Sequence, residues 1–365
     1  MGSARRNPSP PPPPPGSSPG QALEGEGEEQ CVEHLQLDAP PPWHTDGADW
    51  PNRTASRFVA AAGIRWHVQI MGQGPVLLLL HGTGASTHSW AELAPLLARH
   101  YTVIAPDLPG HGFTEALPPR RLSLPGMAEA VAQLVQTLHL PPALAVGHSA
   151  GAAILIRMAL DARIAPRALV ALNGALLPFA GLAGVLFAPL AKLLSLNPLI
   201  PRLFAWRALD RGAVERLVES TGSRLTERQL DLYVRLLRNA AHVQGALDMM
   251  ANWDLRALGA DLPRLGVPLT LVVAERDGTV PPAQAEQARA LLPAARIVRL
   301  PGLGHLAHEE DAARVAAAID EVAGACGVRH RTARDAVFPH PNPSPGGRGA
   351  SNPLPPGEGG RAAAG

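Results

Sequence analysis

The chain has 365 residues, with 32 basic and 31 acidic side chains, so its formal net charge is +1. A balance this close to neutral gives no overall field favouring nucleic acid, and we expect no nucleic-acid partner. Only two cysteines occur, Cys31 and Cys326, which excludes a disulfide framework and favours a reducing, cytoplasmic compartment.

Both ends of the chain are rich in proline and glycine. The range 1–45 contains the run Pro10 to Pro15, and the range 328–365 has the same character. Such segments cannot bury enough apolar surface to fold, so we expect two disordered tails around one domain at 46–327. The N-terminal stretch also lacks the apolar run of a signal peptide.

Strand and helix patterns alternate through the predicted domain. It opens with two strand-like runs in "RFVAAAGIRWHVQIMGQG", and "PVLLLLHG" then reads as a buried parallel strand that ends at glycine. Further strands are expected at 101–110, 143–148, 167–174, 269–277 and 295–302, and helices at 89–100, 123–140, 150–162, 281–293 and 309–325, with Ser123 as a helix cap. This alternation predicts a parallel sheet covered on both faces, with reactive groups at the carboxyl ends of its strands.

The range 174–262 reads as helical and interrupts the alternation, so we expect a cap over those carboxyl ends. Its apolar run 175–196 contains one charge, Lys192, and has the length of a membrane span, but Pro178 and Pro189 interrupt it. The run could form the cap's own core, line a pocket, or present a surface to lipid or to a partner protein, and the sequence does not distinguish these three interpretations. Arg202 and Arg207 suit propionate groups or an ordinary exposed face equally well.

A candidate nucleophile lies in "GHSAG", residues 147–151, between a predicted strand and a predicted helix. The pattern matches G-x-S-x-G, in which small neighbours allow a sharp, strained turn that presents the serine hydroxyl. We therefore predict that Ser149 is a nucleophile, the alternative being an ordinary helix cap.

A serine nucleophile needs a base and an acid, which in this topology follow later strands in the order Ser, Asp, His. Asp277 follows the strand in "LTLVVAERD", and His305 follows the strand in "ARIVRLPGLGH". Glu275 is a rival acid that we expect still within its strand. His308 is a rival base that we expect to face solvent or cap the next helix.

Oxyanion donors are expected from two backbone N–H groups. One belongs to Ala150, and the other to Thr83 or, as second choice, Gly84, in the loop after "PVLLLLHG". The same loop, "GTGAST", lacks the third glycine of a dinucleotide fingerprint, so no cofactor is expected. His81, His111 and His148 are read as local packing residues, and no metal-ligand spacing occurs, so we expect no metal.

The segments "LLLLHGTGAST", "APDLPGHGFT", "GHSAG", "ERDGTVPP" and "GLGHLAHEE", in this order, resemble the α/β-hydrolase superfamily over residues 50–327. This resemblance implies a mostly parallel eight-stranded sheet with helices on both faces, an inserted helical cap and esterase-like acyl-enzyme chemistry. The strings "WPNRTASRFV", "HGTGASTHSW", "NPLIPRLFAWRA" and "MMANWDL" are more specific. They resemble the magnesium-chelatase accessory proteins (BchO) of bacteriochlorophyll biosynthesis.

The narrower resemblance implies a role at magnesium insertion into a porphyrin, with magnesium chelatase as a partner. A small apolar ester or a tetrapyrrole-like molecule would be the substrate, and the cap would contact the photosynthetic membrane peripherally. The alternative is a non-catalytic porphyrin-binding or chelatase-associated protein that retains the hydrolase fold.

Overall fold

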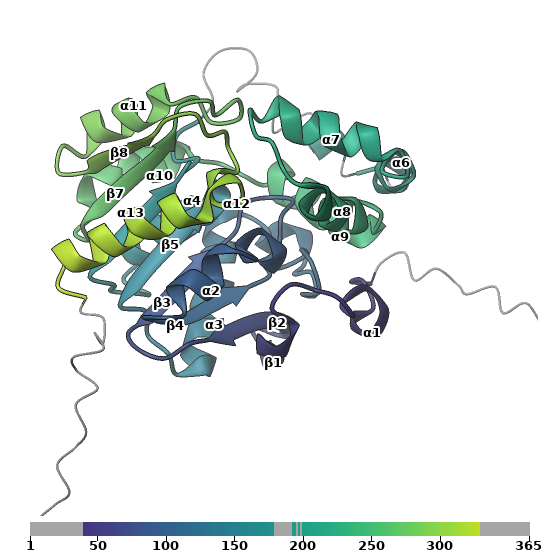
Figure 1. The fold of residues 1–365 in the computed structure, drawn as a ribbon, viewed down its shortest axis with the longest axis horizontal. Helices are drawn as coiled ribbons and strands as arrows, with labels where there is room; N and C mark the ends of the chain where they lie inside the picture. The colour runs from purple at the N-terminus through teal and green to yellow at the C-terminus, as the bar shows by residue number, and fades with distance from the viewer. Residues whose placement is uncertain (1–38, 179–191, 195, 198, 329–365) are drawn as a thin grey trace, which may run out of the picture. The chain divides into compact units, whose positions relative to one another are not determined.

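The computed structural model describes residues 39–178, 192–194, 196–197 and 199–328. Within them, eight strands form one sheet in the order β1-β2-β4-β3-β5-β6-β7-β8 (Figure 1). The pairings β1–β2 and β2–β4 are antiparallel and the other five are parallel, which confirms the mostly parallel sheet expected from the sequence. The strands are β1 (Ser56–Ala61), β2 (Ile64–Met71), β3 (Val76–Leu80), β4 (Thr102–Pro106), β5 (Leu144–His148), β6 (Ala168–Leu172), β7 (Leu269–Ala274) and β8 (Arg296–Leu300).

Helices cover both faces of the sheet because its central strands are apolar on both sides. In β3, Leu78 and Leu80 pack toward α3 (Leu124–Leu138) and α4 (Ala150–Leu160). Leu77 and Leu79 pack toward α2 (Leu93–Leu97) and α13 (Ala312–Ala325), which lie together on the near face in Figure 1. Side chains alternate along a strand, so a strand buried on both faces must be apolar at every position.

A helical insertion connects β6 to β7. Its described helices are α6 (Leu199–Arg207), α7 (Arg211–Ser220), α8 (Glu227–Leu237), α9 (Ala240–Ala251) and α10 (Arg256–Asp261). We call residues 174–262 the cap. Residues 179–191, the centre of the apolar run noted above, lie outside the described residues. No helix in the described part of the chain is both long enough and apolar enough to cross a membrane.

The remaining elements are the helix α11 (Ala283–Leu291) and several short ones. The short elements are the helices α1 (Trp43–Asp46) and α12 (Ala307–Glu310) and the 3₁₀ turns Arg53–Ala55, Thr87–Trp90, Pro119–Arg121 and Leu262–Arg264. Residues 1–38 and 329–365, most of the two predicted tails, lie outside the described residues. Trp43, within the expected N-terminal tail, packs edge-on against Phe58 and Phe113.

Two predicted helices differ from the structure. The helix expected at 89–100 is reduced to α2 after a 3₁₀ turn, because Pro95 has no N–H to extend the helix backward. The helix expected at 309–325 is divided at Asp311, whose side chain accepts a hydrogen bond from the Arg314 amide (3.0 Å) and starts α13. Ser123 occupies the N-cap position of α3, but its side chain makes no capping hydrogen bond.

Candidate active site

Ser149 lies at the corner between β5 and α4, where the backbone is strained. Its φ of 50° and ψ of −117° fall where non-glycine residues are rare. A Cβ on Gly147 would collide with the backbone of Ala152, and one on Gly151 would collide with the Leu80 carbonyl. The two glycines thus permit the close approach of β5, α4 and β3. Ser149 is half-buried, whereas its immediate neighbours His148 and Ala150 are buried.

His305 and Asp277 form a buried pair at the ends of the neighbouring strands β8 and β7. The His305 Nδ1 atom lies 2.8 Å from Asp277 Oδ2, with only 7% and 1% of the two side chains exposed. A carboxylate accepts hydrogen bonds, so Nδ1 carries the proton in this pair. Nε2 is then the ring atom available to accept a proton from a substrate or a nucleophile.

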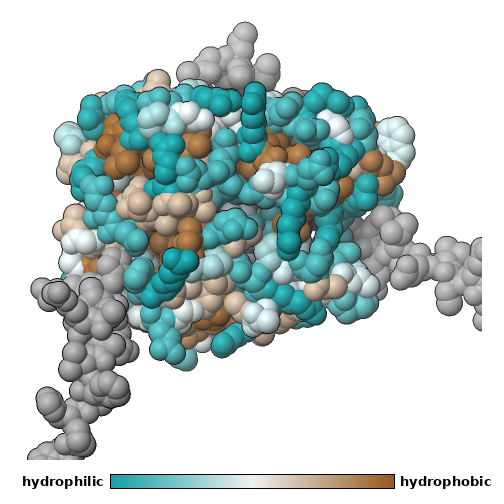
Figure 2. All heavy atoms as spheres, in the orientation of Figure 1, coloured by the Kyte–Doolittle hydropathy of each residue, from teal (hydrophilic) through white to brown (hydrophobic). Residues whose placement is uncertain are grey.

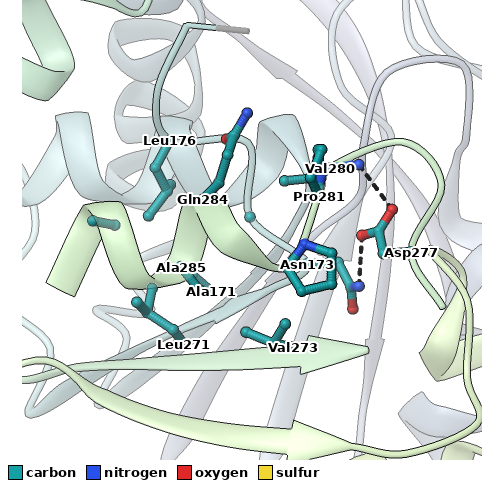
Figure 3. Close-up of a pocket in the computed structure, with 13 residues that line it drawn as sticks. Ala171, Asn173, Leu176, Leu271, Val273, Asp277, Val280, Pro281, Gln284 and Ala285 are labelled. Atoms are coloured by element: carbon teal, nitrogen blue, oxygen red, sulfur yellow. Dashed lines mark hydrogen bonds between the residues drawn. The ribbon is translucent and has the colours of Figure 1, made fainter. Parts of the chain in front are cut away.

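Four donors hold the Asp277 carboxylate. Oδ2 accepts from Asn173 Nδ2 (2.7 Å) as well as from His305, while Oδ1 accepts from the Thr279 and Val280 amides (2.8 Å each). Figure 3 shows the bonds from Asn173 and Val280 to the two oxygens. Together these donors fix the orientation of the carboxylate.

The serine corner and the histidine loop are joined through His148. Its Nε2 donates to the His305 carbonyl (2.9 Å), and the two rings lie 4.6 Å apart between centroids. Burial holds the pKa of His148 well below its ordinary value, so the ring is neutral. Because Ser149 follows His148 directly, this bond ties the His305 loop to the residue before the serine, although no hydrogen bond joins Ser149 Oγ to His305 Nε2 in the part of the chain that the structure describes.

The predicted oxyanion loop lies against the same corner. A Cβ on Gly82 would come within 3.0 Å of the Ser149 Cβ, so the chain passes the serine at van der Waals distance. Among the described residues, the Thr83 amide has no hydrogen-bond partner. Ala150 is the first residue of α4, and its N–H has no acceptor within the helix. Gly84, the second choice, has a φ of 77° and its carbonyl accepts from His242 Nε2 (3.1 Å).

The rival residues occupy different environments from those expected. Glu275 follows the last residue of β7, rather than lying within it, and is exposed. The expectation that His308 faces solvent or caps a helix is wrong. Its ring is fully buried, and its Nε2 lies 2.6 Å from Ser89 Oγ, because the short helix α12 turns it toward the 3₁₀ turn at 87–90.

Asn173 is a further residue of the candidate site, and no sequence motif predicts it. It follows β6 with a φ of 48°, which asparagine tolerates better than most residues. Its position before Gly174, at the end of a predicted strand, is the one sequence feature that could have indicated a role at this edge of the sheet. Asn173, Asp277 and Gln284 line a pocket with mostly apolar walls (Figure 3), and neither Ser149 nor His305 lines it. This pocket is therefore a cavity beside Asp277.

No metal-binding group of three or more histidine, cysteine, aspartate or glutamate side chains occurs within the described ranges. The buried histidines instead make protein hydrogen bonds. His81 Nε2, for example, accepts from the Leu108 amide (2.8 Å).

The chain matches a family model and known proteins over most of its length. The family model of the alpha/beta hydrolase fold matches residues 75–312. The "Magnesium-chelatase 30 kDa subunit" of Rhodobacter capsulatus is 40% identical over 264 residues, covering 72% of this chain and 92% of that protein. The "Pimeloyl-[acyl-carrier protein] methyl ester esterase" of Xylella fastidiosa is 28% identical and covers 69% of this chain and 96% of its own.

Two solved structures show the same fold. An alpha/beta hydrolase fold protein from Burkholderia ambifaria superposes with a TM-score of 0.62 at 22% identity, covering 73% of this chain and 97% of its own. A serine hydrolase involved in carbazole degradation superposes with a TM-score of 0.60 at 22% identity, covering 74% and 98%. Likeness at this level of identity concerns the fold alone.

Proposed function

The chain belongs to the α/β-hydrolase family, and from this premise we propose that it is a serine hydrolase with Ser149, His305 and Asp277 as its catalytic triad. The observation that carries the proposal is the strained Ser149 corner, tied through His148 to the buried His305–Asp277 pair.

In the proposed reaction, Ser149 Oγ attacks the acyl carbon of an ester while His305 Nε2 takes the hydroxyl proton. The Ala150 amide and that of Thr83, or Gly84, stabilise the oxyanion, each contributing about 10² to 10³ in rate. His305 then gives its proton to the departing alcohol. Water, activated by His305, cleaves the acyl-enzyme to release the acid and restore Ser149.

The biological role that we propose is that of an accessory factor at the magnesium-chelatase step of bacteriochlorophyll biosynthesis. The similarity to the Rhodobacter capsulatus chelatase subunit supports it. A small apolar ester or a tetrapyrrole-like molecule would be the substrate, and magnesium chelatase the protein partner. The same similarity favours a second candidate, a non-catalytic porphyrin-binding or chelatase-associated protein on the same fold.

Covalent labelling with a fluorophosphonate tests the chemistry. We expect the wild-type protein and a Ser123→Ala control to be labelled, since the Ser123 side chain makes no capping bond. Labelling should be lost in Ser149→Ala and fall steeply in His305→Ala. Equal labelling of wild type and Ser149→Ala would refute the nucleophile.

A pigment-producing cell separates the two candidate roles. If Ser149→Ala abolishes bacteriochlorophyll synthesis at normal protein level, the hydrolase serves the pathway. If synthesis continues unchanged in Ser149→Ala while substitutions in the cap abolish it, the hydrolytic role fails and the binding role is supported.

We also propose that the cap contacts anionic membrane lipid through α6. Nine large apolar side chains are exposed among the described residues, and eight of them lie between Leu193 and Leu217. Brown spheres near the right edge of Figure 2 fall where Figure 1 draws α6. The exposed fractions range from 45% to 73% over the group that we call the α6 surface: Leu196, Leu199, Leu203, Phe204, Trp206 and Leu209.

The positive charge on α6 favours an anionic bilayer as the partner of the α6 surface. The two charged residues of α6 are Arg202 and Arg207, both exposed, and no acidic residue occurs between Leu193 and Leu209. Arg207 forms an ion pair with Asp210 just beyond the helix (2.8 Å), so Arg202 supplies the unbalanced positive charge of this surface. Exposed aromatic and aliphatic side chains with arginine between them are typical of helices that lie in a membrane interface.

Co-sedimentation with vesicles tests this contact. Wild-type protein should sediment with vesicles of phosphatidylcholine and phosphatidylglycerol and less with phosphatidylcholine alone. The double variant Leu203→Glu/Trp206→Glu should stay in solution. Leu291→Glu, which changes the one exposed large apolar side chain that the structure describes outside the cap, should behave as wild type. If the wild-type protein is a dimer and sediments with neither kind of vesicle, the lipid proposal fails and a second copy of the chain covers the α6 surface instead.

A further inference from the structure

The turn between α7 and α8 in the cap contacts both loops that carry the proposed acid and base. The turn consists of Thr221, Gly222 and Ser223. The Thr221 carbonyl accepts from the Gly278 amide (2.9 Å), one residue after Asp277, and also from the His305 amide (3.2 Å). One oxygen atom of the cap thus bridges the acid loop and the base loop.

Steric fit makes this contact a close one. Gly222 has a φ of 82°, and a Cβ on it would collide with the Arg276 carbonyl in the acid loop. A Cβ on Gly304, in the base loop, would collide with Gly222. The three segments pack backbone against backbone, so a displacement of the turn must displace both loops.

Ser223 supplies the side-chain part of the contact. It is 1% exposed, and its Oγ accepts a hydrogen bond from the Leu306 amide (2.8 Å). Leu306 directly follows His305 and belongs to a cluster of apolar residues with Val218 of α7 and Leu230 and Tyr233 of α8. Without the hydroxyl, the buried Leu306 N–H would have no partner and the backbone beside His305 would shift to find one.

We propose that the Thr221–Ser223 turn sets the geometry of the His305–Asp277 pair and that Ser223 is a positioning residue for catalysis. This inference rests on the proposed hydrolase function. The cap would then have a second role besides covering the strand ends, because its backbone contacts hold the loops that carry the base and the acid.

Steady-state kinetics on a p-nitrophenyl ester provide the first test. In Ser223→Ala, kcat should fall about 10²-fold, the loss expected for a displacement of about 1 Å at a reacting group, while KM stays near the wild-type value. Ser223→Thr keeps the hydroxyl and should recover most of kcat. The matched control is Ser220→Ala, because Ser220 is exposed and its Oγ donates to the Leu217 carbonyl of the same helix, away from the acid and base loops.

The low-field proton resonance of His305 Nδ1–H, assigned by its loss in His305→Ala, provides the second test. Ser223→Ala should shift or broaden it, and Ser220→Ala should not. An unchanged resonance and unchanged kcat in Ser223→Ala would overturn the proposal, as would equal losses in Ser220→Ala. If wild type hydrolyses no ester, the proposed function fails, yet the resonance still decides whether Ser223 positions His305.

Discussion

At the scale of single residues, the Asp277 carboxylate uses both of its oxygens. Backbone amides bond to Oδ1, and the side chains of His305 and Asn173 bond to Oδ2. Backbone amides are fixed donors, so the Oδ1 position must remain an acceptor whatever replaces Asp277.

This asymmetry predicts the effect of Asp277→Asn. The amide oxygen would take the Oδ1 position, and the amide NH₂ would face His305 Nδ1. His305 would then carry its proton on Nε2 and could not accept one from Ser149. We expect kcat to fall by about 10⁴, as for loss of the correct tautomer in serine hydrolases. Glu275→Gln, at an exposed side chain, should leave kcat unchanged; near-normal turnover in Asp277→Asn would place the acid elsewhere.

The sequence predicted site residues whose roles depend on local backbone. Ser149, Ala150, Asp277 and His305 each follow a strand, and strand ends can be read from apolar runs and glycines. Side-chain contacts that come from distant loops could not be predicted in this way. Asn173 reaches Asp277, and Ser89 reaches His308, only after distant strands and loops have packed.

At the scale of elements, the packing of β5 and α4 depends on glycine. Gly151 allows the helix to lie against the Leu80 carbonyl of β3. Because both partners are backbone, neither can turn aside to admit a larger residue.

We therefore expect Gly151→Ala to lower the free energy of unfolding by about 1 to 3 kcal/mol or more, as overpacking does. Gly324→Ala is the matched control, since Gly324 lies in the helix α13 with open space around its Cα. At position 324 we expect alanine to raise the free energy of unfolding by about 0.5 to 1 kcal/mol. Urea denaturation of both variants measures the difference, and equal effects would contradict the steric account.

The structure of the cap was harder to predict than that of the sheet. An apolar run such as 175–196 has the same composition whether it forms a core, lines a pocket or lies on the surface, because composition does not show what the run packs against. Ala175 and Leu176 are buried, Leu193 and Leu196 are exposed, and the middle of the run lies outside the described residues.

At the scale of the whole molecule, buried histidines govern the response to acid. Burial lowers the pKa of six of them, His81, His88, His111, His148, His242 and His308, and brings His88 to about 3 and His242 to about 4. The unfolded chain therefore binds protons first, near the ordinary value of 6.5. We expect the free energy of unfolding to decrease as pH falls below 6.5, with a slope that approaches about 1.4 kcal/mol per pH unit for a histidine that is protonated in the unfolded chain alone. A flat profile from urea titrations at successive pH values would contradict this.

Glu309 opposes that trend. Burial raises its pKa to about 7, while its Oε1 accepts from Ser89 Oγ and Tyr233 Oη (2.7 Å each). The folded state keeps this proton where the unfolded state has lost it, so Glu309 reduces stability as pH rises from 4.5 through 7. Glu309→Gln keeps an acceptor and removes the titration. Its stability relative to wild type should rise with pH across this window, by about 1 kcal/mol per unit. A constant difference would contradict the assignment.

The insertion of the cap between β6 and β7 also sets the order in which the site is made during translation. Ser149 and the loop at 81–84 leave the ribosome first, the helices α6 to α10 next, and Asp277 and His305 last. The turn at 221–223 is thus already synthesised when β7 and β8 add to the growing edge of the sheet. A nascent chain stalled before β8 would hold a serine without its base, so hydrolytic activity should appear only once the last strand has emerged.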